Sequence, residues 1–93
     1  RKASALRPGD ARYAWTLGFY LTKQKRTDAA VEVLKGAVKR GAVNAELYAL
    51  LGDLLHKRGE SDAARRLYLD ASRDMSLPPG VRQRFARRAA SLR

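Results

Sequence analysis

The sequence contains no cysteine, and its 93 residues include only one histidine, one tryptophan and one methionine. Without cysteine the chain forms no disulfide, thiolate metal site or thiol nucleophile, and a single histidine excludes most zinc sites and Ser-His-Asp arrangements. Glycine-rich phosphate loops are missing, as are apolar runs of about 20 residues, the length of a membrane-spanning helix. We therefore expect no cofactor, no metal, no catalytic activity and no membrane span.

A chain of this length is one small domain, and 45% hydrophobic with 31% charged residues is the composition of a soluble, folded one. Basic residues outnumber acidic residues by 20 to nine, which gives a net charge of +11. This charge favours acidic partners, phosphate backbones or anionic surfaces. Arginine outnumbers lysine fourteen to six, and this Ala/Arg-rich composition indicates a bacterial, GC-rich genome. The compartment is unknown.

The chain repeats itself at an interval of 34 residues. Nine of the 33 residue pairs between 10/44 and 42/76 are identical. They are Ala11/Ala45, Leu17/Leu51, Gly18/Gly52, Leu21/Leu55, Lys23/Lys57, Asp28/Asp62, Ala29/Ala63, Ala30/Ala64 and Ala37/Ala71. A 34-residue period is typical of a solenoid built from helical hairpins.

Local signals predict two helices in each unit and a fifth helix after them. The residues that begin or end these helices are Asp10, Thr27, Gly41, Asn44, Gly59, Ser61 and Pro79. Asp10 and Asn44 are predicted N-caps. Lys25 stands where the second unit has Gly59, so we expect a positive φ at Lys25 or at Arg26 beside it, or else a different turn.

Apolar residues recur at spacings of three and four between these signals, as on the buried face of a helix. The predicted faces are Tyr13, Leu17, Tyr20 and Leu21 in the first helix and Val81, Phe85, Ala89 and Leu92 in the last. Gly18 and Gly52 are predicted to let paired helices approach closely. Because burying a leucine is strongly favourable, Leu17 and Leu51 are expected to dominate the stability of each unit.

This pattern resembles the tetratricopeptide repeat, whose signature is Trp-x2-Leu-Gly-x2-Tyr, then Ala-x3-Phe, Ala and Pro. The matching residues are Ala14, Leu17, Gly18, Leu21, Ala30, Leu34 and Ala37 in the first unit and Tyr48, Leu51, Gly52, Leu55, Ala64, Tyr68 and Ala71 in the second. Ala14 replaces the usual aromatic residue, and Ala42 and Ser76 replace the closing proline. Ala3, Leu6 and Pro8 look like the end of an earlier unit.

The resemblance implies an all-α, right-handed α-solenoid of two antiparallel helix-turn-helix repeats, residues 10–43 and 44–77, with a C-terminal capping helix at 78–93. Residues 1–9 would be the remnant of an upstream repeat, and the chain the C-terminal end of a longer array. Without that neighbour the first helix exposes apolar surface, so self-association is expected.

In proteins that look like this, the first helices of successive repeats line a concave groove that binds a peptide or protein. The corresponding residues are Trp15, Phe19, Thr22 and Lys23, followed by Glu46, Asp53, His56 and Lys57. Trp15 and Phe19 lie one turn apart and form a candidate anchor, unless they pack in the core or on an upstream repeat. They replace the Lys and Asn with which some members bind C-terminal carboxylates, so the expected ligand is apolar or partly acidic.

The last predicted helix carries a basic face of Arg84, Arg87 and Arg88. This face suits a solvated cap, an acidic protein partner or, least favoured, nucleic acid. The favoured function is a non-catalytic protein–protein interaction scaffold that binds its ligand in the groove. The alternatives are a basic helical-repeat module that binds RNA or DNA, and an oligomerisation or linking segment of a larger protein.

Overall fold

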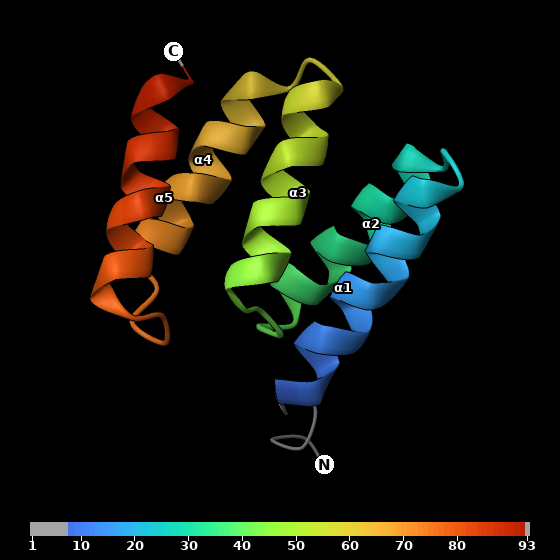
Figure 1. Ribbon diagram of the computed structural model, residues 1–93, viewed down its shortest axis with the longest axis horizontal. Coiled ribbons are helices and arrows are strands. Elements are labelled where there is room, and N and C mark those ends of the chain that lie inside the picture. Colours follow the sequence, from blue (N-terminus) through green and yellow to red (C-terminus); the bar gives the residue numbers. More distant parts are fainter. Residues whose placement is uncertain (1–7, 93) are drawn as a thin grey trace.

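The computed structural model describes residues 8–92, which form five helices and no strand (Figure 1). The helices are α1 (Pro8–Lys23), α2 (Thr27–Lys39), α3 (Ala45–Lys57), α4 (Ser61–Ser72) and α5 (Pro79–Ser91). Packing is most extensive within α1/α2, α3/α4 and α4/α5, and α3 also packs on both helices of the first hairpin. This is the predicted solenoid of two hairpins and a capping helix, with α1 and α5 at opposite ends.

The predicted helix boundaries are confirmed at four of the five starts. The Asn44 carboxamide oxygen accepts a hydrogen bond from the Leu47 N–H at 2.8 Å, so Asn44 caps α3. Helices α2, α4 and α5 begin at Thr27, Ser61 and Pro79. Asp10 as the cap of α1 is wrong, because α1 begins at Pro8, whose missing N–H suits the first turn of a helix. Ala3 and Leu6 of the expected upstream remnant lie outside the described residues.

The hydrophobic core runs through small, branched and aromatic residues of all five helices. Its best-buried large side chains are Val31, Leu34, Leu47, Leu51 and Leu54. The core of α5 consists of Phe85 and Ala89, while Val81 and Leu92 are only partly buried. In the described part of the chain, no helix is long and apolar enough to cross a membrane.

The predicted buried face of α1 is wrong in part. Tyr13 and Tyr20 are 71% and 57% exposed, and Leu17 is only partly buried, so it does not dominate its unit as Leu51 does. The prediction is confirmed for Leu21, and the other buried residues of α1 are Ala11, Ala14 and Gly18. The positions 34 residues after Tyr13, Leu17 and Tyr20 are buried leucines of α3. Helix α3 packs on its partner α4 and also on both helices of the preceding hairpin, whereas α1 has no preceding hairpin within residues 8–92.

The two predicted close approaches are confirmed at Gly18 and Gly52. A Cβ atom on Gly18 would lie 2.9 Å from the side chain of Leu34. A Cβ atom on Gly52 would overlap the ring of Tyr68, which packs directly on the α3 backbone. Each hairpin therefore closes because its first helix lacks a side chain where the second helix presents its largest buried one.

We expect Gly52→Ala to destabilise the fold by about 1–3 kcal/mol, because the Tyr68 ring is buried and must move to admit the methyl group. Gly36→Ala is the matched control. Its added Cβ would meet only the end of Arg40 at 3.6 Å, so the better helix propensity of alanine should stabilise by up to about 1 kcal/mol. Urea denaturation of both variants measures the difference, and equal effects would contradict this account.

The turn between α1 and α2 contains a lysine in the left-handed region. Lys25 has φ = 62°, which confirms the expectation, while Gly59 at the equivalent place has φ = 83°. A side chain disfavours this conformation by roughly 1–2 kcal/mol. Lys25→Gly should therefore raise the free energy of unfolding by about 1 kcal/mol, and the reciprocal Gly59→Lys should lower it. A melting temperature of Lys25→Gly at or below that of the parent would refute this.

Candidate functional site

The surface formed by α1, α3 and α5 is hollowed by three cavities that share Arg88, and a further cavity of about 540 Å³ adjoins them between α1 and the start of α3. The first, about 380 Å³, lies between α1 and α3; the second, about 300 Å³, lies between α3 and α5; and the third, about 200 Å³, lies near the end of α5. The first two share Glu46 and Ala49, the first and third share Asp53, and Arg88 lines all three. They make one continuous feature, the α1/α3/α5 groove.

One wall of the groove is an aromatic pair on α1. The rings of Trp15 and Phe19 are stacked, with centroids 5.1 Å apart and an interplanar angle of 8°. Trp15 is partly buried and Phe19 is 42% exposed. The Lys23 ammonium lies 5.5 Å from the centroid of the Phe19 ring and extends the stack by one turn. Both rings line the first cavity, and neither belongs to the hydrophobic core.

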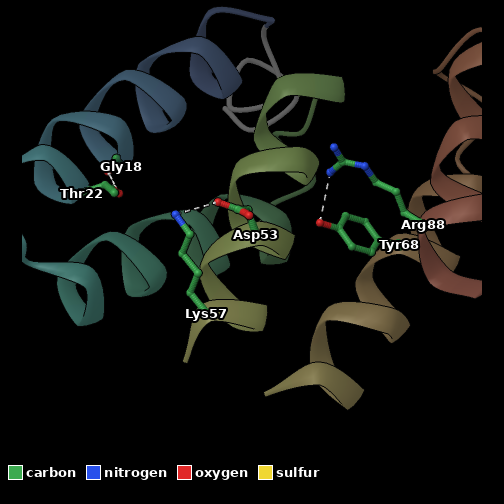
Figure 2. Close-up of polar contacts among 6 residues, drawn as sticks. All are labelled: Gly18, Thr22, Asp53, Lys57, Tyr68 and Arg88. Atoms are coloured by element: carbon green, nitrogen blue, oxygen red, sulfur yellow. Dashed lines mark hydrogen bonds and ion pairs between the residues drawn. The ribbon is translucent and has the colours of Figure 1, made fainter. Parts of the chain in front are cut away.

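The other predicted groove residues divide into those that line the groove and those that do not. Asp53 and His56 line it, whereas Lys57 forms an ion pair with Asp53 at 3.4 Å (Figure 2). The Thr22 hydroxyl donates to the Gly18 carbonyl at 2.8 Å, within its own helix, and lines none of the cavities. In the described part of the chain no His, Asp and Glu side chains are grouped to hold a metal ion.

The predicted basic face of α5 is split by the structure. Arg84 and Arg88 line the same groove as Trp15 and Phe19, whereas Arg87 lines none of the three cavities. The Arg88 guanidinium lies 5.5 Å from the Tyr68 ring centroid and donates to the Tyr68 hydroxyl at 3.3 Å (Figure 2). Two features that the sequence presents as separate are therefore brought together.

The apolar floor of the groove was missed by the sequence reasoning. It consists of Ala45, Ala49, Val81 and Phe85, between the aromatic wall of α1 and the arginines of α5. The 34-residue period contains a signal for Ala49, because this residue is the counterpart of Trp15. Alanine at that position leaves open the space that a second tryptophan would fill.

Comparison with known proteins agrees with the repeat pattern. A family model described as tetratricopeptide repeat matches residues 21–76, which is more than half of the chain. The chain belongs to the tetratricopeptide repeat family. No curated protein and no solved structure matches it significantly. Members of this family are typically non-enzymatic scaffolds, and the match includes the whole of α2, α3 and α4.

An aromatic cluster holds α5 on the second tetratricopeptide hairpin. Phe85 meets Tyr48 edge to face at 6.0 Å and stacks on Tyr68 at 5.8 Å between centroids. The Tyr48 hydroxyl also donates to Asp74 at 2.8 Å, in the turn before α5. Phe85 and Tyr68 are thus shared by the core and the groove, and the position of Arg88 depends on both.

The Tyr48–Asp74 hydrogen bond changes the pKa of both groups. Burial raises the pKa of Tyr48, and the hydrogen bond to Asp74 raises it further. Burial alone would raise the pKa of Asp74, but hydrogen bonds from the Ser76 hydroxyl and N–H and from Tyr48 outweigh it and leave the pKa lowered. The folded state therefore favours the ionised carboxylate.

Tyr48→Phe should lower the free energy of unfolding by about 1 kcal/mol at neutral pH, because Asp74 loses one donor. A lowered carboxyl pKa stabilises the fold above its unfolded-state value, and this stabilisation disappears as pH falls through the folded-state pKa. The difference between Tyr48→Phe and the parent should accordingly shrink in acid. Urea denaturation at neutral and acidic pH tests this, with Tyr13→Phe, an exposed tyrosine, as control; a constant difference would contradict it.

Proposed function

We propose that the chain is a non-catalytic protein–protein interaction module that binds a peptide segment in the α1/α3/α5 groove. Tetratricopeptide repeats generally mediate protein–protein interaction, which supports the class of function. The observation that carries the assignment to the groove is the stacked Trp15–Phe19 pair, half-exposed beside an apolar floor.

The stacked rings of Trp15 and Phe19 suit a binding anchor because their side chains lose little conformational entropy when a ligand binds. Trp15 and Phe19 already hold one another, so binding orders few additional bonds while it buries a large aromatic area. The floor at Ala49 admits a bulky side chain next to the rings. Aromatic residues in such central positions dominate the affinity of many interfaces.

Although the net charge is +11, the surroundings of the groove arginines suit a peptide better than a nucleic acid. Phosphate-driven binding needs basic side chains on a polar surface that follows a backbone. The groove arginines instead border alanine, valine and phenylalanine, which a polyphosphate chain would leave exposed. The alternative of an oligomerisation segment predicts that the chain self-associates, and the exposed Tyr13 and Tyr20 of α1 are available for such a contact.

Trp15→Ala should weaken binding of a peptide selected from a random library by about 2 kcal/mol or more, roughly 30-fold in Kd, because the anchor is lost. The fold should persist, since Trp15 lies outside the core. Tyr20→Ala removes an exposed aromatic from the same helix outside the groove and is the matched control. Calorimetry measures affinity and circular dichroism the fold. If both variants bind equally well, or Trp15→Ala unfolds the protein, the groove is not the site.

A further inference from the structure

Arg88 occupies a position that the repeat does not fix in the core, because the equivalent residue of α1, Tyr20, is 57% exposed and Arg88 itself is exposed. The residue 34 positions earlier is Leu54, which is 2% exposed in α3. Core packing of α5 rests on Phe85 and Ala89, so the core does not require a charged group at position 88. Its side chain lies beside the buried Tyr68 ring, and its guanidinium donates to the Tyr68 hydroxyl (Figure 2). The same arginine lines the groove.

Two guanidinium groups in the groove lack an acidic partner within the described part of the chain. The ion pairs there involve Lys57, Arg58 and Arg65, and none involves Arg84 or Arg88. Of the carboxylates that line the groove, Asp53 is already paired with Lys57, which leaves Glu46 against two arginines. The α5 side of the groove therefore has an excess of positive charge.

Tyr68 holds Arg88 in place before any ligand arrives. Its hydroxyl accepts one hydrogen bond from the guanidinium at 3.3 Å, and its ring makes a cation–π contact with the same group at 5.5 Å. Arginine has five N–H donors, so four of them stay available. A held guanidinium loses less side-chain entropy when it forms a two-pronged pair with a carboxylate.

The apolar floor of the groove determines which kind of side chain must lie next to the acidic residue of the ligand. The space beside Arg88 is lined by Ala49 and Phe85 on one side and by Trp15 and Phe19 on the other. A ligand that only carried charge would leave these groups uncovered. A peptide with an aromatic or bulky aliphatic residue next to an acidic residue matches both halves of the groove.

Extending the proposed function, we propose that the groove selects acidic–aromatic peptide segments, with Arg88 as the residue that determines specificity for the acid. A side-chain carboxylate of Asp or Glu pairs with Arg88 and Arg84. The neighbouring apolar side chain packs between Ala49 and the Trp15–Phe19 pair. Tyr68 acts as a positioning residue for Arg88.

The test uses an array of short peptides of equal length in four sets: acidic–aromatic, the same with amides in place of the acids, acidic without aromatics, and basic–aromatic. We expect the parent protein to bind the acidic–aromatic set at least about ten-fold tighter than the amide set, as for a charge-assisted hydrogen-bonded pair. Arg88→Glu should reverse the preference toward the basic–aromatic set. Arg87→Glu makes the same charge change on α5 outside the groove and should leave the preference unchanged.

Two further variants separate positioning from mere stability. Arg88→Lys keeps the charge and should retain part of the preference for acid. Tyr68→Phe keeps the ring but removes the hydroxyl, and should reduce that preference by a few-fold without weakening the amide set. Circular dichroism of each variant checks that the helices persist.

The outcomes distinguish this inference from the proposed function. If the parent binds the acidic and amide sets equally, and Trp15→Ala abolishes both, the groove binds peptides but the inference about acid is overturned. If no set binds, or binding ignores Trp15→Ala, the proposed function fails as well. Tighter binding of a generic single-stranded oligonucleotide than of the acidic–aromatic set, at about 150 mM salt, overturns the choice of a peptide over a nucleic acid.

Discussion

The packing of the Tyr68 ring on the bare backbone of Gly52 is the contact on which the C-terminal half of the molecule depends. The ring that closes on α3 also stacks on Phe85, and this stack docks α5. The same ring then supports the Arg88 guanidinium at the groove. One absent side chain therefore links the closing of a hairpin, the attachment of the capping helix and the placement of a charge at the candidate site.

Repetition of the backbone and variation of the side chains together produce the groove. Trp15 in α1 and Ala49 in α3 are equivalent by the 34-residue period, yet one forms a wall and the other a floor. Leu54 and Arg88 are equivalent in the same sense, and one lies in the core while the other reaches the surface. The scaffold needs small and branched residues at its contacts, and it leaves the remaining positions free for binding.

The helix boundaries were predictable because their causes act within one turn: the Asn44 cap and the positive φ at Lys25 both depend on neighbouring atoms. The buried side of α1 was not predictable from its own periodicity. Tyr13 and Tyr20 have the spacing of a core face, but burial depends on which helices lie nearby, and the buried residues of α1 are mostly small, with Gly18 close to Leu34 of α2. Local chemistry fixes where a helix ends, whereas tertiary contacts decide which face it buries.

One part of the candidate site could be predicted from the sequence, and the other part depends on tertiary contacts. Trp15 and Phe19 follow from the repeat register on one helix, but the meeting of Arg88 with these rings requires α5 to be set at a particular place over α4. Phe85, held between Tyr48 and Tyr68, sets that place. No sequence spacing expresses it, because it results from the shapes of three rings on three helices. The net charge of +11 likewise says little about binding until the structure shows which two arginines border an apolar floor.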